Sequence, residues 1–264
     1  MCDNWWGIAL LDVVGKAFGR LIQSRLQQLA ECELPDAQCG FRSGRSCTDQ
    51  IFVVRQIVEK LYEHRSPGFL VFIDLRKAYD SIPREALWQA LELLGAPPQL
   101  VQVIKAFHGG MTAQVRVGGS TTSCFNVNNG LRQRCCMAPV LFNLFFSLVL
   151  EKWHQEMARV GGPDGIAFHY NLNGNLFNRP CSRHQHGSLS DLEFADDAVL
   201  FALSWQRAQL ALVVFHSVAT SFGLTVSFIK TKVLACGTGL SSEDCQSIPD
   251  AEESVANVQS FLEA

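Results

Sequence analysis

The sequence predicts an α+β fold in which helices pack on an antiparallel sheet. Apolar residues recur at helical spacing in some segments and alternate with period two in others. These segments do not follow a strict strand–helix–strand repeat, which argues against a wholly parallel sheet. The 264 residues are 48% hydrophobic and 18% charged, so the chain is globular and can bury a sizeable core as one large domain or two small ones.

The first predicted elements are a helix and a buried strand. Residues 48–61 carry apolar side chains at helical spacing after two candidate N-cap residues, Ser46 and Thr48. Residues 68–75 form a short apolar run with β-branched and aromatic residues, which predicts a buried strand. That strand delivers Asp74 at its end.

A second helix, a ribbon and a third helix follow. The helix runs from Pro83 to Gly95, which act as its start and stop signals. Alternating apolar residues with intervening glycines predict an antiparallel ribbon over 113–127. An apolar helix is expected over roughly 139–153, with a proline in its first turn.

The last third of the chain contains an insertion, another helix and a further extended segment. Residues 161–190 are rich in Gly, Asn, Pro and His and predict a surface insertion. Residues 208–222 present a helical apolar face that ends before a glycine. Residues 224–237 alternate again and predict a strand pair, or a strand and a turn.

The sequence predicts neither a membrane span nor a secretory leader. The longest apolar stretch, 140–150, is interrupted by polar residues and is too short to cross about 30 Å of hydrocarbon as a helix. The N-terminal residues lack a basic region and a small-residue cleavage site. We therefore expect an intracellular protein that is not secreted.

The ten cysteines are expected to be reduced thiols, because their spacings show no regular disulfide framework. Cys181, His184 and His186 resemble half of a zinc site, but no second ligand pair accompanies them, and a solvated loop is the better interpretation. The net charge of −3 gives no general attraction for nucleic acid, so any phosphate-binding function must depend on local patches.

The segment LEFADDAVLFA places two adjacent carboxylates, Asp196 and Asp197, within an apolar run. Flanking strand formers predict a tight turn between two short strands, which would expose both side chains. Carboxylates this close raise each other's pKa unless a cation compensates, and a divalent metal ion compensates most strongly. With Asp74, three strand-end carboxylates suit a two-metal phosphoryl-transfer site. A hairpin turn without chemistry is the alternative.

Four segments in order resemble motifs A to D of reverse transcriptases: FIDLRKAYDSI, NNGLRQRCCMAPVLFNLFF, EFADDAVLF and GLTVSFIKTK. Upstream, NWWGIALLDVVGKAFGRLIQSRL and QCGFRSGRSCTDQIF resemble fingers segments of the non-LTR, LINE-type retrotransposon branch. The resemblance covers residues 4 to about 236. It implies the palm and fingers of a right-hand polymerase.

The resemblance also implies the reaction and its metal ligands. Asp74, Asp196 and Asp197 would hold two Mg²⁺ ions, for which Mn²⁺ can substitute, with the Leu75 carbonyl as a further ligand. Lys230 matches a lysine proposed to protonate the leaving pyrophosphate, although an exposed turn would also explain a lysine there. A primer 3′-hydroxyl would attack the α-phosphate of a dNTP, templated by RNA.

Further residues match nucleotide contacts of the family. Tyr79 matches a ring that excludes a 2′-hydroxyl, with a core tyrosine as the alternative. Arg42 matches a triphosphate contact, Gly130 permits close backbone approach, and Gln133 matches a side chain beside the incoming nucleotide and template. Arg45 and Lys16 have two interpretations: they assist in binding phosphate or template, or they are solvated surface residues.

Three residues depart from the family pattern. Arg134 stands where a glycine is usual, and there a large cation would crowd the nucleotide or template. Ile229 replaces a proline, and Trp6 replaces an arginine. The primer grip and thumb of the family do not follow, and we expect a polymerase fragment truncated before the thumb.

The expected fingers comprise residues 1–70 and 84–130, and the palm 71–83 and 131–236, with 237–264 as the truncated start of the thumb connection. The favoured function is an RNA-directed DNA polymerase that binds an RNA template with a DNA primer and dNTPs, in the nucleus when active. A remnant that only binds nucleic acid, or has no function, is the alternative. A different two-metal enzyme is disfavoured by the ordered motifs.

Overall fold

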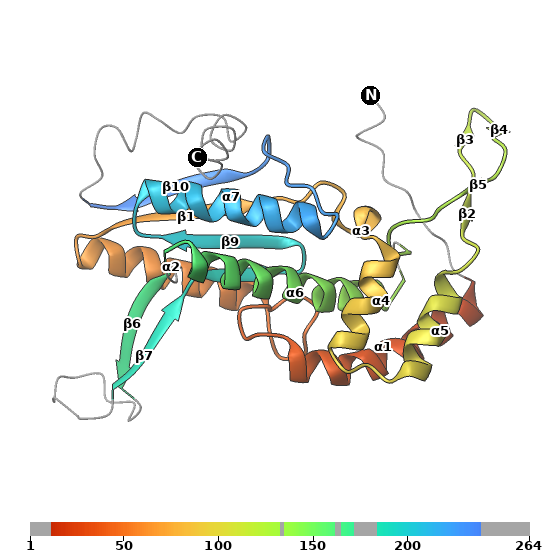
Figure 1. Ribbon diagram of the computed structural model, residues 1–264, viewed down its shortest axis with the longest axis horizontal. Helices are drawn as coiled ribbons and strands as arrows, with labels where there is room; N and C mark the ends of the chain where they lie inside the picture. Colours follow the sequence, from red (N-terminus) through yellow and green to blue (C-terminus); the bar gives the residue numbers. More distant parts are fainter. Residues whose placement is uncertain (1–11, 133–134, 162–164, 172–183, 239–264) are drawn as a thin grey trace.

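The computed structural model describes residues 12–132, 135–161, 165–171 and 184–238 (Figure 1). Four residues discussed above lie outside these ranges: Trp6, Gln133, Arg134 and Cys181. No helix in the described ranges combines the length and the apolar character that crossing a membrane requires.

A four-stranded antiparallel sheet forms the centre of the fold, in the order β10-β1-β9-β8. Its strands are β1 (Pro67–Ile73), β8 (Asp191–Phe194), β9 (Asp197–Ala202) and β10 (Lys232–Gly237). Every neighbouring pair is antiparallel, so the predicted α+β class is confirmed. The expected boundary between fingers and palm, after residue 70, falls inside β1, of which residues 67–72 pair with β10 and residues 69–73 pair with β9. The division into fingers and palm stays a prediction.

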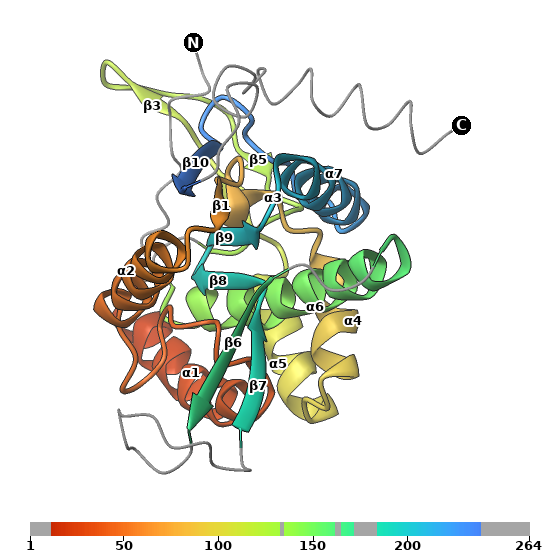
Figure 2. The same ribbon diagram turned by 90° about the vertical axis from the view of Figure 1, so that its left-hand side faces the viewer.

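Helices cover both faces of this sheet (Figure 2). Helices α6 (Ala138–Arg159) and α7 (Trp205–Ser221) cover one face, and α2 (Cys47–Glu63) covers the other. Successive residues of a strand face opposite sides, and in β1 the side chains of Phe69 and Leu70 accordingly join different hydrophobic clusters. Burial on both faces explains why β1 is apolar along almost its whole length.

Three further helices lie at one end of α6: α1 (Val13–Glu33), α4 (Arg84–Leu93) and α5 (Pro98–His108). The helix expected from Pro83 to Gly95 is confirmed as α4. Helices α1 and α5 were not predicted, although each buries a stripe of residues at helical spacing.

Local sequence signals explain how several helices begin and end. Ser46 is the N-cap of α2 and forms a reciprocal capping box with Asp49, which decides between the two candidate caps. Gly95 has a positive φ of 78° just after α4, a conformation that glycine adopts without strain. The apolar helix α6 extends six residues beyond the predicted residue 153.

Two ribbons extend from the body of the molecule. The predicted ribbon over 113–127 is confirmed by two short strand pairs: β2 (Thr112–Ala113) with β5 (Phe125–Asn126), and β3 (Arg116–Val117) with β4 (Ser120–Thr121). Strands β6 (Ile166–Asn171) and β7 (His184–Leu189) pair as a hairpin that projects from the body, where a surface insertion was expected (Figure 1).

Candidate active site

The Asp196–Asp197 pair lies at a hairpin turn, as predicted. Phe194 of β8 pairs with Asp197 of β9, so only Ala195 and Asp196 connect the two strands. Ala195 has a positive φ of 59°. This is the first connecting position of a two-residue hairpin, where glycine is typical in one of the two favoured turn types. The turn directs two consecutive carboxylates toward the end of the sheet.

Asp74 reaches the same end from the neighbouring strand. Ile73 pairs with Ala198, and continuing this register by one residue sets Asp74 opposite Asp197. Directly opposed residues of antiparallel strands have Cα atoms about 4.5–5.5 Å apart. The structure therefore brings all three predicted carboxylates to one end of the strands β1, β8 and β9.

The carboxylates repel one another electrostatically. Burial raises the pKa of Asp196, and the negative charges of Asp197 and Asp74 raise it further, while Lys230 opposes the shift. Burial and the charge of Asp74 also raise the pKa of Asp197. The site thus carries negative charge that its own residues compensate only in part, and a bound cation would relieve the repulsion.

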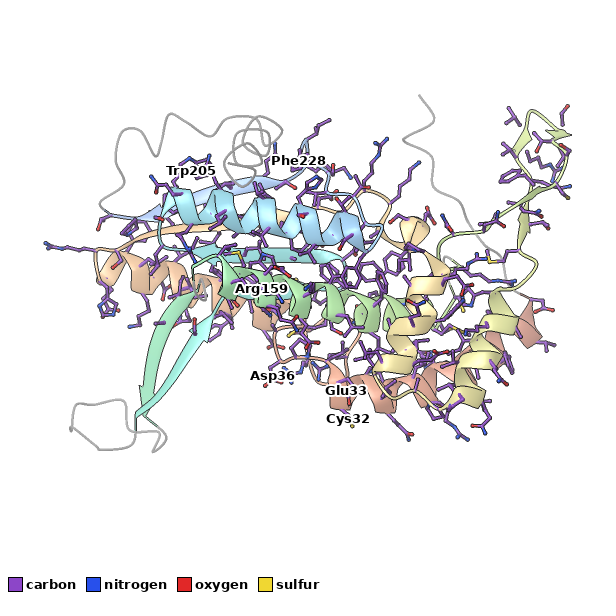
Figure 3. The ribbon with its side chains drawn as sticks, in the orientation of Figure 1. Cys32, Glu33, Asp36, Arg159, Trp205 and Phe228 are labelled. Carbon is purple, nitrogen blue, oxygen red and sulfur yellow. The ribbon has the colours of Figure 1, made fainter. Side chains whose placement is uncertain are left out.

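Lys230 brings a positive charge to these carboxylates. Its Nζ lies 3.4 Å from Asp74 Oδ1, an ion pair in which Asp74 Oδ1 is buried and accepts no hydrogen bond. Phe228, two residues before Lys230, is labelled beside α7 in Figure 3. Its ring centroid lies 5.0 Å from that of His216 on α7, and this contact anchors the turn. A buried carboxylate oxygen without a hydrogen bond is suited to a metal ion.

The donor set fits Mg²⁺ or Mn²⁺, both of which take oxygen ligands. Within residues 12–132, 135–161, 165–171 and 184–238, no group of three or more His, Cys, Asp or Glu side chains is arranged so that it could coordinate a metal ion. The three aspartates therefore form a charge cluster rather than a closed cage, and sharing a cation would require their side chains to turn toward each other.

The hydrogen bonds on either side of Leu75 set the direction of its carbonyl. Arg76 N donates to Thr225 O at 2.8 Å, and Ser227 N donates to Asp74 O at 2.8 Å. These bonds flank the antiparallel bridge between Leu75 and Val226. In such a pair the central N–H and C=O groups point outward, so the Leu75 carbonyl points away from Val226, on the β9 side.

Tyr79 lies on the short helix α3 (Ala78–Ser81), which follows Asp74. Its ring centroid is 4.8 Å from that of Phe142 on α6. Burial raises the Tyr79 pKa, and the charges of Asp196 and Asp197 raise it further, which places the phenol within electrostatic reach of the carboxylates. The ring is thus half-buried: it lies near the carboxylates and also packs against the hydrophobic core.

Gly130 holds the neighbouring loop against α3. Its N–H donates to Ile82 O at 2.9 Å, and Leu131 N donates to Tyr79 O at 2.8 Å. Gly130 has a φ of 78°, and a Cβ atom there would lie 2.6 Å from Asp80 O. Only glycine permits this close approach, as predicted for the position, although the approach observed is to α3.

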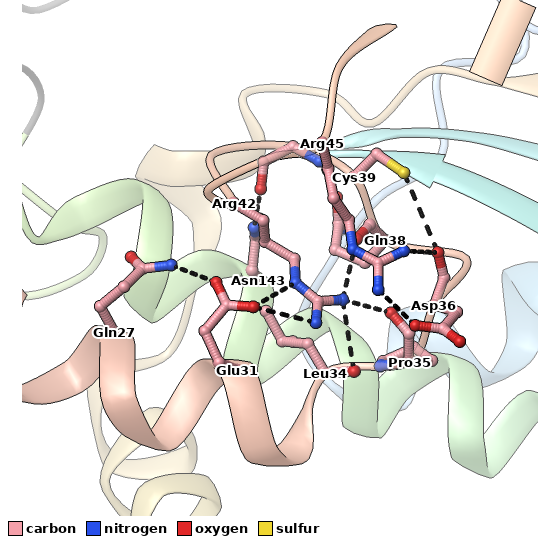
Figure 4. A network of polar contacts seen from close by, with 11 residues as sticks. Gln27, Glu31, Leu34, Pro35, Asp36, Gln38, Cys39, Arg42, Arg45 and Asn143 are labelled. Atoms are coloured by element: carbon pink, nitrogen blue, oxygen red, sulfur yellow. Dashed lines mark hydrogen bonds and ion pairs between the residues drawn. The ribbon is translucent and has the colours of Figure 1, made fainter. Parts of the chain in front are cut away.

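Arg42 is not placed to contact a triphosphate, which corrects the prediction for this residue. Its side chain is 3% exposed and forms an ion pair with Glu31 at 3.2 Å (Figure 4). The guanidinium also donates to three main-chain carbonyls, those of Leu34, Pro35 and Gln38. All its donor groups are committed within the fingers segment, so the role of Arg42 is to fix that segment.

The roles of Arg45 and Lys16 at phosphate or template stay predictions. Arg45 pairs with the exposed Asp36, and Lys16 is exposed on α1. Sequence reasoning missed Gln38, which is fully buried and hydrogen-bonds to both main-chain polar groups of Ala195. Its signal was only a polar residue within a resembling fingers segment, because its partners lie far along the chain.

The sequence is similar to a polymerase family and to polymerases of mobile elements. A family model described as "Reverse transcriptase (RNA-dependent DNA polymerase)" matches residues 2–256. The RNA-directed DNA polymerase from mobile element jockey of Drosophila melanogaster is 29% identical over 148 residues, 55% of this chain and 16% of that protein. The Pol polyprotein from retrotransposable element R2DM of the same organism is 26% identical over 206 residues, 78% of this chain and 17% of that protein.

The fold is that of a right-hand polymerase. The solved structure of apo telomerase from Candida tropicalis, truncated from its C-terminal domain, matches with a TM-score of 0.55 at 13% identity. The match covers 86% of this chain and 42% of that one. At this identity the likeness concerns the fold alone, whereas the family model covers nearly the whole sequence. This chain therefore belongs to the reverse transcriptase (RNA-dependent DNA polymerase) family.

Proposed function

We propose that the chain is the RNA-directed DNA polymerase domain of a non-LTR retrotransposon. It would join dNTPs to a primer 3′-hydroxyl on an RNA template. The observation that carries this proposal is the meeting of Asp74, Asp196 and Asp197 at adjacent strand ends, where burial and mutual repulsion raise the pKa of two of them. The retrotransposon polymerases to which the chain is similar support the choice of reaction.

Two Mg²⁺ ions are the proposed cofactors, with Mn²⁺ as a substitute. Asp74, Asp196, Asp197 and the Leu75 carbonyl would hold them. Divalent ions at such a site stabilise the attacking and leaving oxygens of an in-line phosphoryl transfer. This assignment is supported by the buried Asp74 Oδ1, which has no hydrogen-bond partner.

The chain's own residues supply the remaining roles. Tyr79, held against Phe142, would limit the room beside the sugar 2′-carbon and so favour deoxynucleotides. Lys230 would leave its ion pair with Asp74 and donate a proton to the departing pyrophosphate. Gly130 keeps the loop that leads to Gln133 close to α3, and Gln133 remains a proposed contact to nucleotide and template.

The proposed partners are an RNA template, a DNA primer and dNTPs, with the nucleus as the place of action. The curated relatives are several times longer than the matched region, because the matches cover 16% and 17% of them. Of the activities that a full-length retrotransposon protein has, we therefore propose only the polymerase reaction for this chain.

A primer-extension assay on poly(rA)/oligo(dT) with Mg²⁺ or Mn²⁺ tests the proposal. We expect the purified chain to extend the primer and Asp196→Asn to abolish extension. Asp36→Asn is the matched control, because it makes the same change at an exposed aspartate that pairs with Arg45. No extension by the wild-type chain with either metal, or equal extension by Asp196→Asn, would contradict the proposal.

A further inference from the structure

The segment around Gln38 lies directly against the hairpin that carries Asp196. Cys39 N donates to Glu193 O, and Glu193 N donates to Ala37 O, each at 3.0 Å. These bonds form a parallel bridge between Gln38 and Glu193 of β8. A fingers segment from early in the chain therefore extends the sheet beside the last residues before the turn.

The Gln38 side chain pairs with the main chain of Ala195. Its Oε1 accepts from Ala195 N at 2.9 Å, and its Nε2 donates to Ala195 O at 3.2 Å. The same Oε1 accepts from Gly40 N at 2.8 Å, and the same Nε2 donates to Glu193 Oε2 at 3.1 Å. Gln38 is completely buried, so all four bonds of its amide are made inside the protein.

Ala195 is held in a conformation that an alanine rarely adopts. Its φ of 59° lies in the left-handed region, which clashes with the Cβ atom of L-residues other than glycine. Asp196 follows directly, so the main-chain conformation of Ala195 sets the direction in which the two carboxylates leave the turn. The bonds from Gln38 satisfy Ala195 in this conformation and would be lost in another.

Gln38 and Gly40, whose N–H donates to the Gln38 side chain, are each held by a further side chain (Figure 4). Arg42 Nη1 donates to Gln38 O at 3.1 Å. Asn143 of α6 donates to Gly40 O at 2.7 Å. A Cβ atom on Gly40 would lie 2.3 Å from Ala195 N, so the segment touches the turn with its bare backbone. Buried side chains of the fingers and palm segments thus converge on one residue beside the carboxylates.

We propose that Gln38 is a positioning residue that holds Ala195 in its left-handed conformation and thereby aims Asp196 and Asp197 at Asp74. Arg42 and Asn143 keep Gln38 in place. This inference rests on the proposed function, because it concerns the same metal-binding carboxylates. In this account Gln38, Arg42 and Asn143 shape the site and do not contact the substrate.

Gln38→Met tests the proposal, because methionine fills a similar volume without the amide. Gln50→Met is the matched control: Gln50 is also buried and donates to Ala37 O and Glu193 O, but no bond joins it to Ala195. We expect Gln38→Met to weaken Mn²⁺ binding by about 10–100-fold, the usual effect of losing a residue that orients metal ligands. Amide hydrogen exchange at residues 195–197, measured without metal, should rise in Gln38→Met alone.

Ala195→Gly in the Gln38→Met background distinguishes positioning from general stabilisation. Glycine adopts the left-handed conformation without strain, so part of the lost Mn²⁺ affinity should return. No recovery, or an effect of Gln50→Met as large as that of Gln38→Met, would overturn the proposal. If Gln38→Met does not fold, Gln38→Asn serves instead, since its shorter side chain cannot reach both groups of Ala195.

The outcomes for the two proposals are separable. If the wild-type chain binds Mn²⁺ and Gln38→Met binds it equally well with unchanged exchange, the positioning role is wrong and the polymerase assignment stands. If the wild-type chain neither binds Mn²⁺ nor extends a primer, the polymerase assignment fails. The exchange at residues 195–197 still decides in that case whether Gln38 holds the turn.

Discussion

The ammonium group of Lys230 lies 3.4 Å from the buried Oδ1 of Asp74 and so partly neutralises the carboxylate that the metal site requires. The same lysine is our proposed proton donor to pyrophosphate. Lys230 and a metal ion compete for Asp74, because a cation held by Asp74 would repel the ammonium group of Lys230. Release of Lys230 from Asp74 would therefore accompany metal binding.

Lys230→Met should separate these roles. Mn²⁺ affinity should stay equal or increase, because a competing cation is removed, while the rate of nucleotide transfer should fall by about 10²–10⁴-fold through the loss of a general acid. Single-turnover extension and Mn²⁺ titration measure the two effects. Lys232→Met, at an exposed lysine two residues further on, should change neither. A full transfer rate in Lys230→Met would remove the proton-donor role.

Tyr79→Ala should relax the discrimination between deoxynucleotides and ribonucleotides. The ring lies against Phe142 at 4.8 Å, and removing it opens space beside the proposed sugar position. We expect the ratio of dNTP to rNTP incorporation to fall roughly 10–100-fold, the range that a steric pocket provides. Tyr79→Phe keeps the ring and should retain the ratio. Equal ratios in wild type and Tyr79→Ala would assign the tyrosine to the core.

Gly130→Ala should cost more stability than the same change at Gly95. Both glycines have a φ of 78°, so each substitution carries the left-handed penalty of about 1–2 kcal/mol. Only at Gly130 would the new Cβ meet backbone, 2.6 Å from Asp80 O, whereas Gly95 has open space around it. Urea denaturation measures the difference. Equal losses in the two variants would show that the loop at Gly130 is not held against α3.

Asp196→Asn should stabilise the metal-free protein at neutral pH. Burial and neighbouring negative charges raise the Asp196 pKa, so the folded state holds this proton more tightly than the unfolded state. The contribution of this group to stability therefore falls as the pH rises through the range between the unfolded and folded pKa values. The free energy of unfolding in EDTA should be higher for Asp196→Asn at pH 7, and the gap should narrow toward acid pH. A wild type that is the more stable at pH 7 would contradict the electrostatic account.

Local patterns were sufficient to predict the elements that carry the carboxylates. The apolar run before Asp74 and the apolar segments around Asp196 each encode their strand and its end within about ten residues. From the sequence, we could only infer that these strand ends lie close together. The register of β1 with β9 shows how they do so. Helices α1 and α5 were missed although local signals mark them: Asp12 is the N-cap of α1, and α5 begins with Pro98 and ends before Gly109.

Long-range polar bonds explain the failures at the site. The sequence does not show that Arg42 is paired. Its contacts with Glu31 and Gln38 form only when the fingers segment folds back on α1. Gln38 gave no signal of its own because Ala195 lies far along the chain. A buried amide that pairs with a distant main chain has no local pattern, whereas a strand or a helix cap does.

The most direct test of the account is the binding of divalent cations by the 264-residue chain, since the central claim is that Asp74, Asp196 and Asp197 share them. Titration with Mn²⁺, followed by electron paramagnetic resonance, should show saturable binding of two ions. Asp74→Asn should lose most of this binding while Asp36→Asn, at an exposed aspartate, keeps it. Equal Mn²⁺ binding by wild type and Asp74→Asn, or none by the wild type, would contradict the claim.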